Sequence, residues 1–230
     1  MYKICYLFLL YLMYAFLGWV VEVVNSYIQH KRFINRGFMI GPYCPIYGTG
    51  VLLIIFLLKG YTDNYLVLFI LSMTVCMVVE YLTSLLMELL FNARWWDYSN
   101  RKFNINGRVC LETAIPFGLC GLLIMYVINP IFVKLLDKGS EKFIIILGII
   151  LMILFFTDLI VSFLVVLKYR KAGVENYKDD TEEMNKKVHD YLVSHSYLTK
   201  RFAESFPNAK LKVEKFKKLY EKRKKEIMKK

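Results

Sequence analysis

Eight ionisable residues of this sequence lie within or beside long apolar stretches, where a charge is costly. Charged side chains in such segments normally face a protein interior or water, and they often mark binding or proton-transfer sites. The acidic members could hold a proton or a cationic group, and the basic members could engage a phosphate or a carboxylate. The candidates are Glu22, Glu80, Glu88, Glu112, Asp158, Arg36, Arg94 and Arg108.

Two of the acidic residues are followed by a serine one helical turn later. Ser26 follows Glu22 and Ser84 follows Glu80, so each pair shares a helical face. Two polar faces of the same kind, at the same depth, would enclose a charged pocket with Asp158 near it. We therefore predict a pocket in the cytoplasmic half of a membrane.

A structural alternative stays open for the same residues, because ion pairs and capped helix ends can order a bundle without binding anything. It applies most directly to Glu88 and Glu112, which lie near the ends of their apolar segments. An arginine paired with a carboxylate is as often structural as it is a substrate clamp.

The elements that must position these residues are membrane helices. Apolar residues make up 57% of the 230 residues and aromatic residues 16%, concentrated in residues 1–167. A helix needs about 20 apolar residues to cross a bilayer. The sequence predicts an all-α, polytopic helical membrane bundle of about five transmembrane helices, four of them at residues 4–28, 65–91, 111–136 and 143–167.

The remaining span is irregular. Residues 46–58 are too few to cross the bilayer unless the preceding piece also enters it, and that piece contains Gly37, Gly41, Pro42 and Pro45. Broken backbone at membrane depth needs protein or a water-filled cavity around it. We therefore predict that residues 37–58 form a broken or re-entrant helix.

The sequence predicts an internal repeat that relates residues 17–58 to residues 75–128. Each unit would consist of a helix, a basic loop and a helix interrupted by proline and glycine, and both units would run in the same direction. Transporters built from such repeats place their sites at the repeat interface. The fifth helix, at 143–167, has no counterpart. The matching segments are 20–26 with 78–84, 31–33 with 101–103, 35–37 with 106–108, and 45–48 with 116–118.

Residues 168–230 form a basic tail that carries most of the net charge of +12. Because lysine and arginine concentrate on cytoplasmic loops, we expect the N-terminus outside and this tail in the cytoplasm. An apolar stripe within it suits an amphipathic helix on anionic lipid or on a partner. No base-stacking platform accompanies the basic residues, so we expect no nucleic-acid binding. The stripe residues are Val213, Phe216, Tyr220 and Ile227.

Metal and cofactor chemistry is not expected. The five cysteines are odd in number and contain no Cys-x-x-Cys pair, so they read as small apolar side chains rather than as metal ligands or a disulfide framework. Trp95, Trp96 and Tyr98 fit an aromatic belt at the cytoplasmic face of the membrane. We expect no catalytic residue and no cofactor.

Five motifs occur together in residues 35–108. They are Asn35-Arg36-Gly37-Phe38, Gly41-Pro42-Tyr43-Cys44-Pro45-Ile46-Tyr47-Gly48, Glu80-Tyr81, Arg94-Trp95-Trp96-Asp97-Tyr98-Ser99 and Asn106-Gly107-Arg108. With these motifs the chain resembles one bacterial family, the putative ABC-transporter type IV or CmpB-like permeases. The resemblance spans about residues 8–135 and implies a multi-pass protein of a bacterial plasma membrane. The chain has no Gly-x-x-x-x-Gly-Lys-Ser/Thr loop, so ATP-driven transport would require a separate ATPase.

Three functions are consistent with the sequence. The first is a permease-like protein related to transport, working as a homodimer or with a partner membrane or ATPase subunit. The second is a membrane-embedded enzyme acting on a lipid or isoprenoid headgroup, with a carboxylate as base and arginine on phosphate. The third is a non-catalytic scaffold in the lipid bilayer whose basic tail recruits a cytoplasmic partner.

Overall fold

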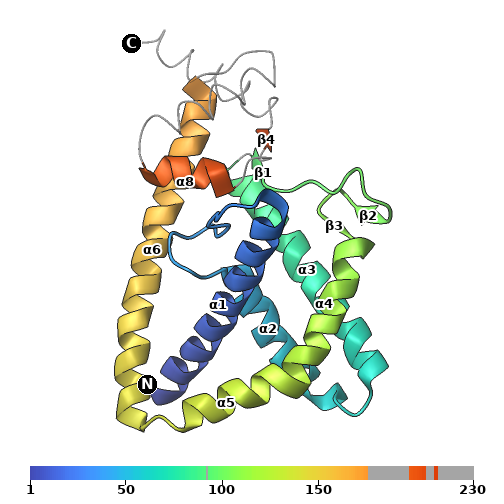
Figure 1. Ribbon diagram of the computed structural model, residues 1–230, viewed down its shortest axis with the longest axis vertical. Coiled ribbons are helices and arrows are strands. Elements are labelled where there is room, and N and C mark those ends of the chain that lie inside the picture. The colour runs from blue at the N-terminus through green and yellow to red at the C-terminus, as the bar shows by residue number, and fades with distance from the viewer. Residues whose placement is uncertain (92, 176–196, 206–209, 212–230) are drawn as a thin grey trace.

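The computed structural model describes residues 1–91, 93–175, 197–205 and 210–211 (Figure 1). It confirms the predicted all-α membrane bundle. The helices are α1 (Tyr2–His30), α2 (Pro45–Leu58), η1 (Lys59–Tyr61), α3 (Tyr65–Phe91), α4 (Leu111–Leu123), η2 (Ile124–Ile128), α5 (Asn129–Asp137), α6 (Glu141–Glu175) and α8 (Tyr197–Ser205). Four two-residue strands are β1 (Ala93–Arg94), β2 (Asn104–Ile105), β3 (Val109–Cys110) and β4 (Lys210–Leu211).

Four helical segments are long and apolar enough to cross a membrane: Tyr2–His30, Tyr65–Phe91, Leu111–Asp137 and Glu141–Leu167. The shortest of them has 27 residues, which gives a length of about 40 Å, more than the hydrocarbon core requires. They coincide with the four long spans expected from the sequence. Helix α6 continues past residue 167 to Glu175, so the expected boundary with the tail falls inside a helix.

Helix α2 begins halfway along α1 because the chain after α1 turns back beside it. The Cys44 N–H donates to the Ala15 carbonyl at 2.9 Å, and the Trp19 indole donates to the Asn35 amide oxygen at 2.7 Å. Ala15 lies about 22 Å from His30 along the axis of α1. Pro45 then starts α2, at the position where a missing N–H costs nothing. Whether residues 37–44 enter the lipid stays a prediction.

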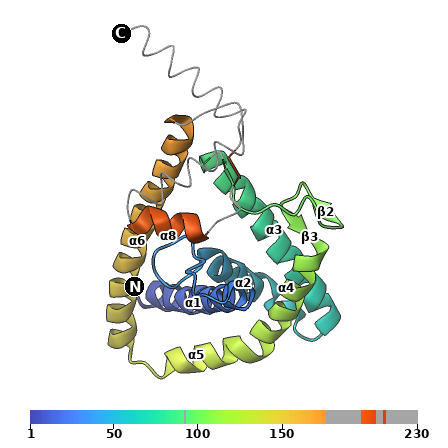
Figure 2. The same ribbon diagram turned by 45° about the horizontal axis from the view of Figure 1, so that its top comes forward.

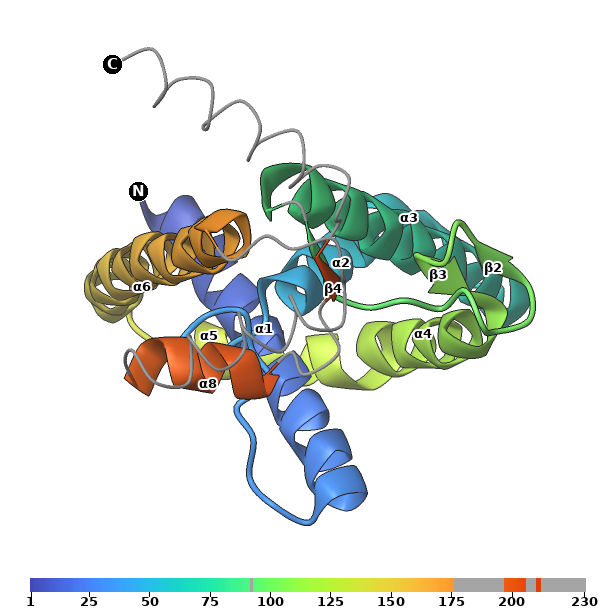
Figure 3. The ribbon, with the colours of Figure 1, turned by 90° about the horizontal axis from the view of Figure 1, so that it is seen from above.

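The helices pack in the order α6, α1, α2, α3 and α4, with α2 between α1 and α3 (Figures 2 and 3). The chain then returns through η2 and α5, which contacts α1. Loops 31–44 and 92–110 lie with α8 at one end of the bundle, and the turns at 59–64 and 138–140 lie at the other (Figure 1). All the loops that carry the candidate residues are therefore at one end.

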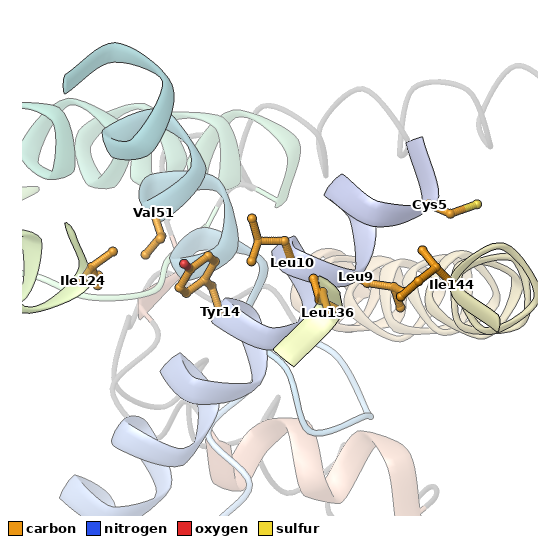
Figure 4. Close-up of a cluster of buried hydrophobic side chains, with 8 residues drawn as sticks. All are labelled: Cys5, Leu9, Leu10, Tyr14, Val51, Ile124, Leu136 and Ile144. Carbon is orange, nitrogen blue, oxygen red and sulfur yellow. The ribbon is translucent and has the colours of Figure 1, made fainter. Parts of the chain in front are cut away.

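A buried apolar cluster joins α1 to α2, η2, α5 and α6 near the other end (Figure 4). Its polar member, Tyr14, donates a hydrogen bond to the Asn129 side chain at 2.9 Å, so its hydroxyl is partnered where water is scarce. The cluster consists of Cys5, Leu9, Leu10, Tyr14, Val51, Ile124, Leu136 and Ile144.

One type of contact involves a glycine in each expected repeat unit and an aromatic ring shortly before that unit. The ring of Tyr11 lies against Gly48, and the ring of Phe69 lies against Gly118. Tyr11 precedes Glu22 by the same number of residues as Phe69 precedes Glu80. A side chain at either glycine would collide with the facing ring, so both glycines permit the close approach of two helices.

The expected interruption of the second repeat unit's helix at Pro116 and Gly118 does not occur there. Helix α4 runs through Pro116 without a break, and the irregular turn is the π-helix η2, directly before Pro130. Proline lacks the N–H of a regular turn and its ring clashes with the carbonyl four residues earlier, which a π turn relieves. In Figure 1, α5 runs at an angle to α4 after this turn.

The expected amphipathic helix containing Val213, Phe216, Tyr220 and Ile227 lies outside the described residues. Two short parts of the tail are described. Helix α8 contacts α6, and β4 pairs antiparallel with β1 through Ala93 and Leu211.

Replacing Gly48 by alanine tests the close approach of α1 and α2. The added methyl group would meet the Tyr11 ring, and overpacking of this kind costs about 1–3 kcal/mol. The matched control is Gly50→Ala, since nothing lies within 4 Å of that position and alanine favours helix. We expect a lower midpoint of thermal unfolding in detergent for Gly48→Ala and an equal or higher midpoint for Gly50→Ala. Equal midpoints for the two variants would contradict the contact.

Candidate functional site

The first candidate carboxylate, Glu22 on α1, is hydrogen-bonded to the first turn of α2. The Tyr47 hydroxyl donates to Glu22 Oε1 at 2.7 Å. Its ring lies directly over Gly18, one turn before Glu22, where any Cβ would occupy the same space. Gly18 therefore allows the phenol to reach the carboxylate.

The second candidate, Glu80 on α3, has a matching phenol. The Tyr98 hydroxyl donates to Glu80 Oε1 at 3.2 Å, and loop 92–110 positions Tyr98 through a bond from its N–H to the Gly107 carbonyl at 2.8 Å. Burial, and then the nearby Glu80 charge, raise the pKa of Tyr98. The phenol is therefore a neutral hydrogen-bond donor at physiological pH.

The two carboxylate oxygens of Glu80 differ in their hydrogen bonding. The residue is 8% exposed, and its Oε2 atom is buried without a hydrogen-bond partner among the residues that the structure describes. The same holds within that part of the chain for the Ser26 hydroxyl on the Glu22 face of α1. Buried polar atoms are nearly always partnered, so each exception needs an explanation.

Glu22 lies close enough to Glu80 for its charge to act on the Glu80 carboxyl group, and the charges of both glutamates act on Tyr47. The group formed by Glu22, Tyr47, Glu80 and Tyr98 is called the acid pair site below. It lies where α1, α2 and α3 meet, at the level where α2 begins.

Arg108 and Glu88 form a buried ion pair instead of joining the acid pair site. Arg108 Nη2 lies 2.9 Å from Glu88 Oε2, and the side chains are 8% and 5% exposed. Arg108 Nη1 donates to the Ser84 hydroxyl at 3.1 Å, and the guanidinium lies 5.6 Å from the centre of the Tyr81 ring. These contacts fasten the end of loop 92–110 to α3.

Arg94 belongs to the same network. It lies 3.6 Å from Glu88 and 3.2 Å from Asp97, and it donates to the Asn106 carbonyl at 3.1 Å. Glu112 instead pairs with Arg101 at 2.9 Å, with both side chains more than half exposed. Arg36 is half-buried in loop 31–44.

Asp158 on α6 holds loop 31–44. Its carboxylate accepts bonds from the Ile40 and Gly41 N–H groups at 3.0 and 2.7 Å, from the Tyr43 hydroxyl at 2.7 Å and from the Ser162 hydroxyl at 2.8 Å. The two carboxylate oxygens of Asp158 therefore accept bonds from four donors, and Asp158 holds the backbone of loop 31–44 in place.

Tyr47 and Tyr98 are site residues that the sequence does not reveal. The sequence predicts Tyr98 in an interfacial belt with Trp95 and Trp96, whereas its hydroxyl donates to Glu80. Trp95 is 4% exposed, and Trp96 donates to the Arg108 carbonyl at 3.0 Å. Both tyrosines lie in the quoted motifs, yet nothing in the sequence shows which carboxylate each one meets.

The described residues contain no group of three histidine, cysteine or acidic side chains that could hold a metal ion. A family model described as "Putative ABC-transporter type IV" matches residues 9–163, a range that includes the acid pair site and Asp158. No curated protein and no solved structure matches the chain.

Removing Glu88 tests the buried ion pair. Glu88→Ala leaves the Arg108 charge buried without its carboxylate, which typically costs about 3–5 kcal/mol. The matched control is Glu112→Ala, whose exposed pair with Arg101 is worth at most about 1 kcal/mol. We expect a large drop in the thermal unfolding midpoint for Glu88→Ala only. Equal midpoints for the two variants would show that the Glu88 pair does not hold the loop.

Proposed function

Because the chain belongs to the family described as "Putative ABC-transporter type IV", we propose that it is a transport-related membrane protein whose acid pair site binds a proton or a cationic group. The family expected from the motifs is confirmed by a match over residues 9–163. With the four long apolar helices, this makes the chain a multi-pass membrane protein.

The observation that carries the proposal is the buried Oε2 atom of Glu80, which has no hydrogen-bond partner in the part of the chain that the structure describes. Leaving a carboxylate oxygen without a donor in an apolar bundle costs several kcal/mol, roughly. A proton on the carboxyl group removes that cost, and so does a bound cation or ammonium group. The Glu22 charge nearby adds to the preference for a positive group.

The surroundings favour a cationic group over an anionic one. Two carboxylates and two phenols form the site, whereas Arg94 and Arg108 engage Glu88 about two helical turns away. Because Arg94 and Arg108 are paired with Glu88, we do not propose that they bind the phosphate or carboxylate of a ligand. The lipid-headgroup enzyme loses the same support, because it needs arginine on phosphate.

The position of the site also supports a transport role. Glu22 and Glu80 occupy matching positions of the two repeat units, and the glycine contacts at Gly48 and Gly118 support the duplication of residues 17–58 and 75–128. Helix α2 starts beside the site after an irregular stretch. Transporters commonly bind substrate or coupling ions at a repeat interface beside interrupted helices.

The setting we propose is a bacterial plasma membrane, with the N-terminus outside and the tail in the cytoplasm beside anionic lipid. The basic residues of loops 31–44 and 92–110 lie at the same end as α8, which agrees with this orientation (Figure 1). A homodimer, a partner membrane subunit or a separate ATPase would complete the pathway, since the sequence has no phosphate-binding loop of its own.

Cation flux into proteoliposomes tests the role of Glu80. Vesicles that trap a pH-sensitive dye would be given a membrane potential, and flux would be followed with protons alone, with Na⁺ and with methylammonium. We expect protein-dependent flux of at least one cation, loss of that flux in Glu80→Gln, and normal flux in Glu112→Gln. The amide keeps the shape of Glu80 but cannot carry the proton or the charge.

Membrane yield and elution in gel filtration should be equal for the two variants. A Glu80→Gln protein with normal flux would exclude Glu80 as the binding group. Wild-type vesicles that match empty vesicles for all three cations would count against a cation pathway altogether.

A further inference from the structure

Arg201, an arginine of the tail, forms hydrogen bonds to the backbone of loop 31–44. Arg201 of α8 directs both terminal nitrogens at the loop. Nη1 donates to the Met39 and Ile40 carbonyls at 2.7 and 3.5 Å. Nη2 donates to the Gly37 and Phe38 carbonyls at 3.2 and 3.3 Å. Such charge-assisted bonds are stronger than neutral ones, and four consecutive carbonyls share this guanidinium.

Asp158 holds the same stretch through the opposite kind of group. It accepts from the Ile40 and Gly41 N–H groups, so a cation takes the carbonyls while an anion takes the adjacent N–H groups. Burial lowers the pKa of Arg201 and the Asp158 charge opposes that shift, as expected for an arginine that lies above this carboxylate. The backbone of the loop is fixed between α6 and α8.

Two described side chains of α8 donate hydrogen bonds to loop 31–44. Besides Arg201 in the middle of the helix, Ser205 at its C-terminal end donates to the Asn35 carbonyl. Leu198 and Arg201 lie beside Phe38, Ile40, Ser162 and Val165, with no room for a water molecule between them. A short helix fastened by hydrogen bonds to one loop can open locally without unfolding the bundle.

The fixed loop leads directly into the acid pair site. The Cys44 N–H bonds to Ala15, Pro45 begins α2, and Tyr47 in that first turn donates to Glu22. A shift of residues 37–41 is therefore expected to move the start of α2. It would also move the Tyr47 hydroxyl, which donates a hydrogen bond to Glu22.

The two repeat units differ in how their loops are held. Loop 92–110 is fastened by its own Arg108 to Ser84 and Glu88 within the bundle. In the first unit the matching serine, Ser26, is unpartnered among the described residues, and the arginine that holds the loop is Arg201 from the tail. One loop is thus fastened internally and the other by a part of the chain beyond the membrane helices.

We propose that Arg201 is a positioning residue and that α8 is a cytoplasmic latch, which holds loop 31–44 and thereby keeps Tyr47 against Glu22. The importance of that placement rests on the proposed function, but the latch itself does not. Withdrawal of α8 leaves Asp158 as the main hold on the first loop and does not affect the contacts of the second. The tail can therefore switch one half of the acid pair site.

Two native cysteines report on the two loops. Cys44 ends loop 31–44 and Cys110 ends loop 92–110, at 7% and 1% exposed. Two single-cysteine proteins would be made, one with Cys44 and one with Cys110, and in each the other four cysteines would be replaced by serine. Both would be labelled with a water-soluble maleimide. Each would be combined with Arg201→Ala, with Arg201→Lys, or with Lys200→Ala as the exposed neighbour on the same helix.

Arg201→Ala should raise the labelling rate of Cys44 by about tenfold or more, equivalent to about 1.4 kcal/mol in the opening of the loop. The rate at Cys110 should not change, and Lys200→Ala should change neither rate. Arg201→Lys should restore part of the protection, since lysine keeps the charge but loses the two-pronged donor.

An unchanged Cys44 rate in Arg201→Ala would overturn the latch. Equal acceleration at Cys44 and Cys110 would also overturn it, because that result means general loosening of the bundle. Neither outcome bears on Glu80, whose role is decided by flux. Conversely, a normal flux in Glu80→Gln would remove the site and leave the labelling result standing.

Discussion

A carboxylate inside an apolar bundle must find a hydrogen-bond donor or a counter-charge, and this requirement organises the loop end of the molecule. Glu22 takes the Tyr47 phenol, Glu80 the Tyr98 phenol, Glu88 the Arg108 guanidinium, and Asp158 two backbone N–H groups. Each donor comes from a loop or from the helix start that follows it. The acidic residues of the helices therefore determine where the two long loops lie, and the loops determine where α2 and α4 begin.

The carboxylates differ in how many hydrogen-bond donors and counter-charges they have. We use this difference to distinguish residues that hold the structure from the proposed binding residue. Glu88 is paired with Arg94 and Arg108, and Asp158 accepts hydrogen bonds from four donors, so both hold loops in place. Glu80 has one buried oxygen without a hydrogen-bond partner among the described residues, and the Glu22 charge acts on Glu80. Among the described residues, several other buried polar atoms also lack a hydrogen-bond partner, but Glu80 is the one for which we propose a bound proton or cation. Its carboxylate lies where α1, α2 and α3 meet, because Glu22, Tyr47 and Glu80 come from these three helices.

The long membrane spans were predictable because hydropathy depends on local sequence alone. The start of α2 was only partly predictable: Pro45 marked it, but the return of the loop along α1 depends on the distant bond between Cys44 and Ala15. The acidic residues could be identified for the same reason as the spans, since a charge in an apolar run stands out. Their partners could not, because the Glu88–Arg108 pair, the Asp158 contacts and the Arg201 contacts join segments far apart in the chain.

The central claim is that Glu22 and Glu80 form one site across two repeat units. It is tested most directly by infrared titration of the Glu80 carboxyl group, identified as the band that Glu80→Gln removes. If the two residues share a site, Glu22→Gln changes the pH at which that band titrates, because it removes a charge that acts on Glu80. A Glu80 titration identical in wild type and Glu22→Gln would contradict the claim and leave two separate, structural carboxylates.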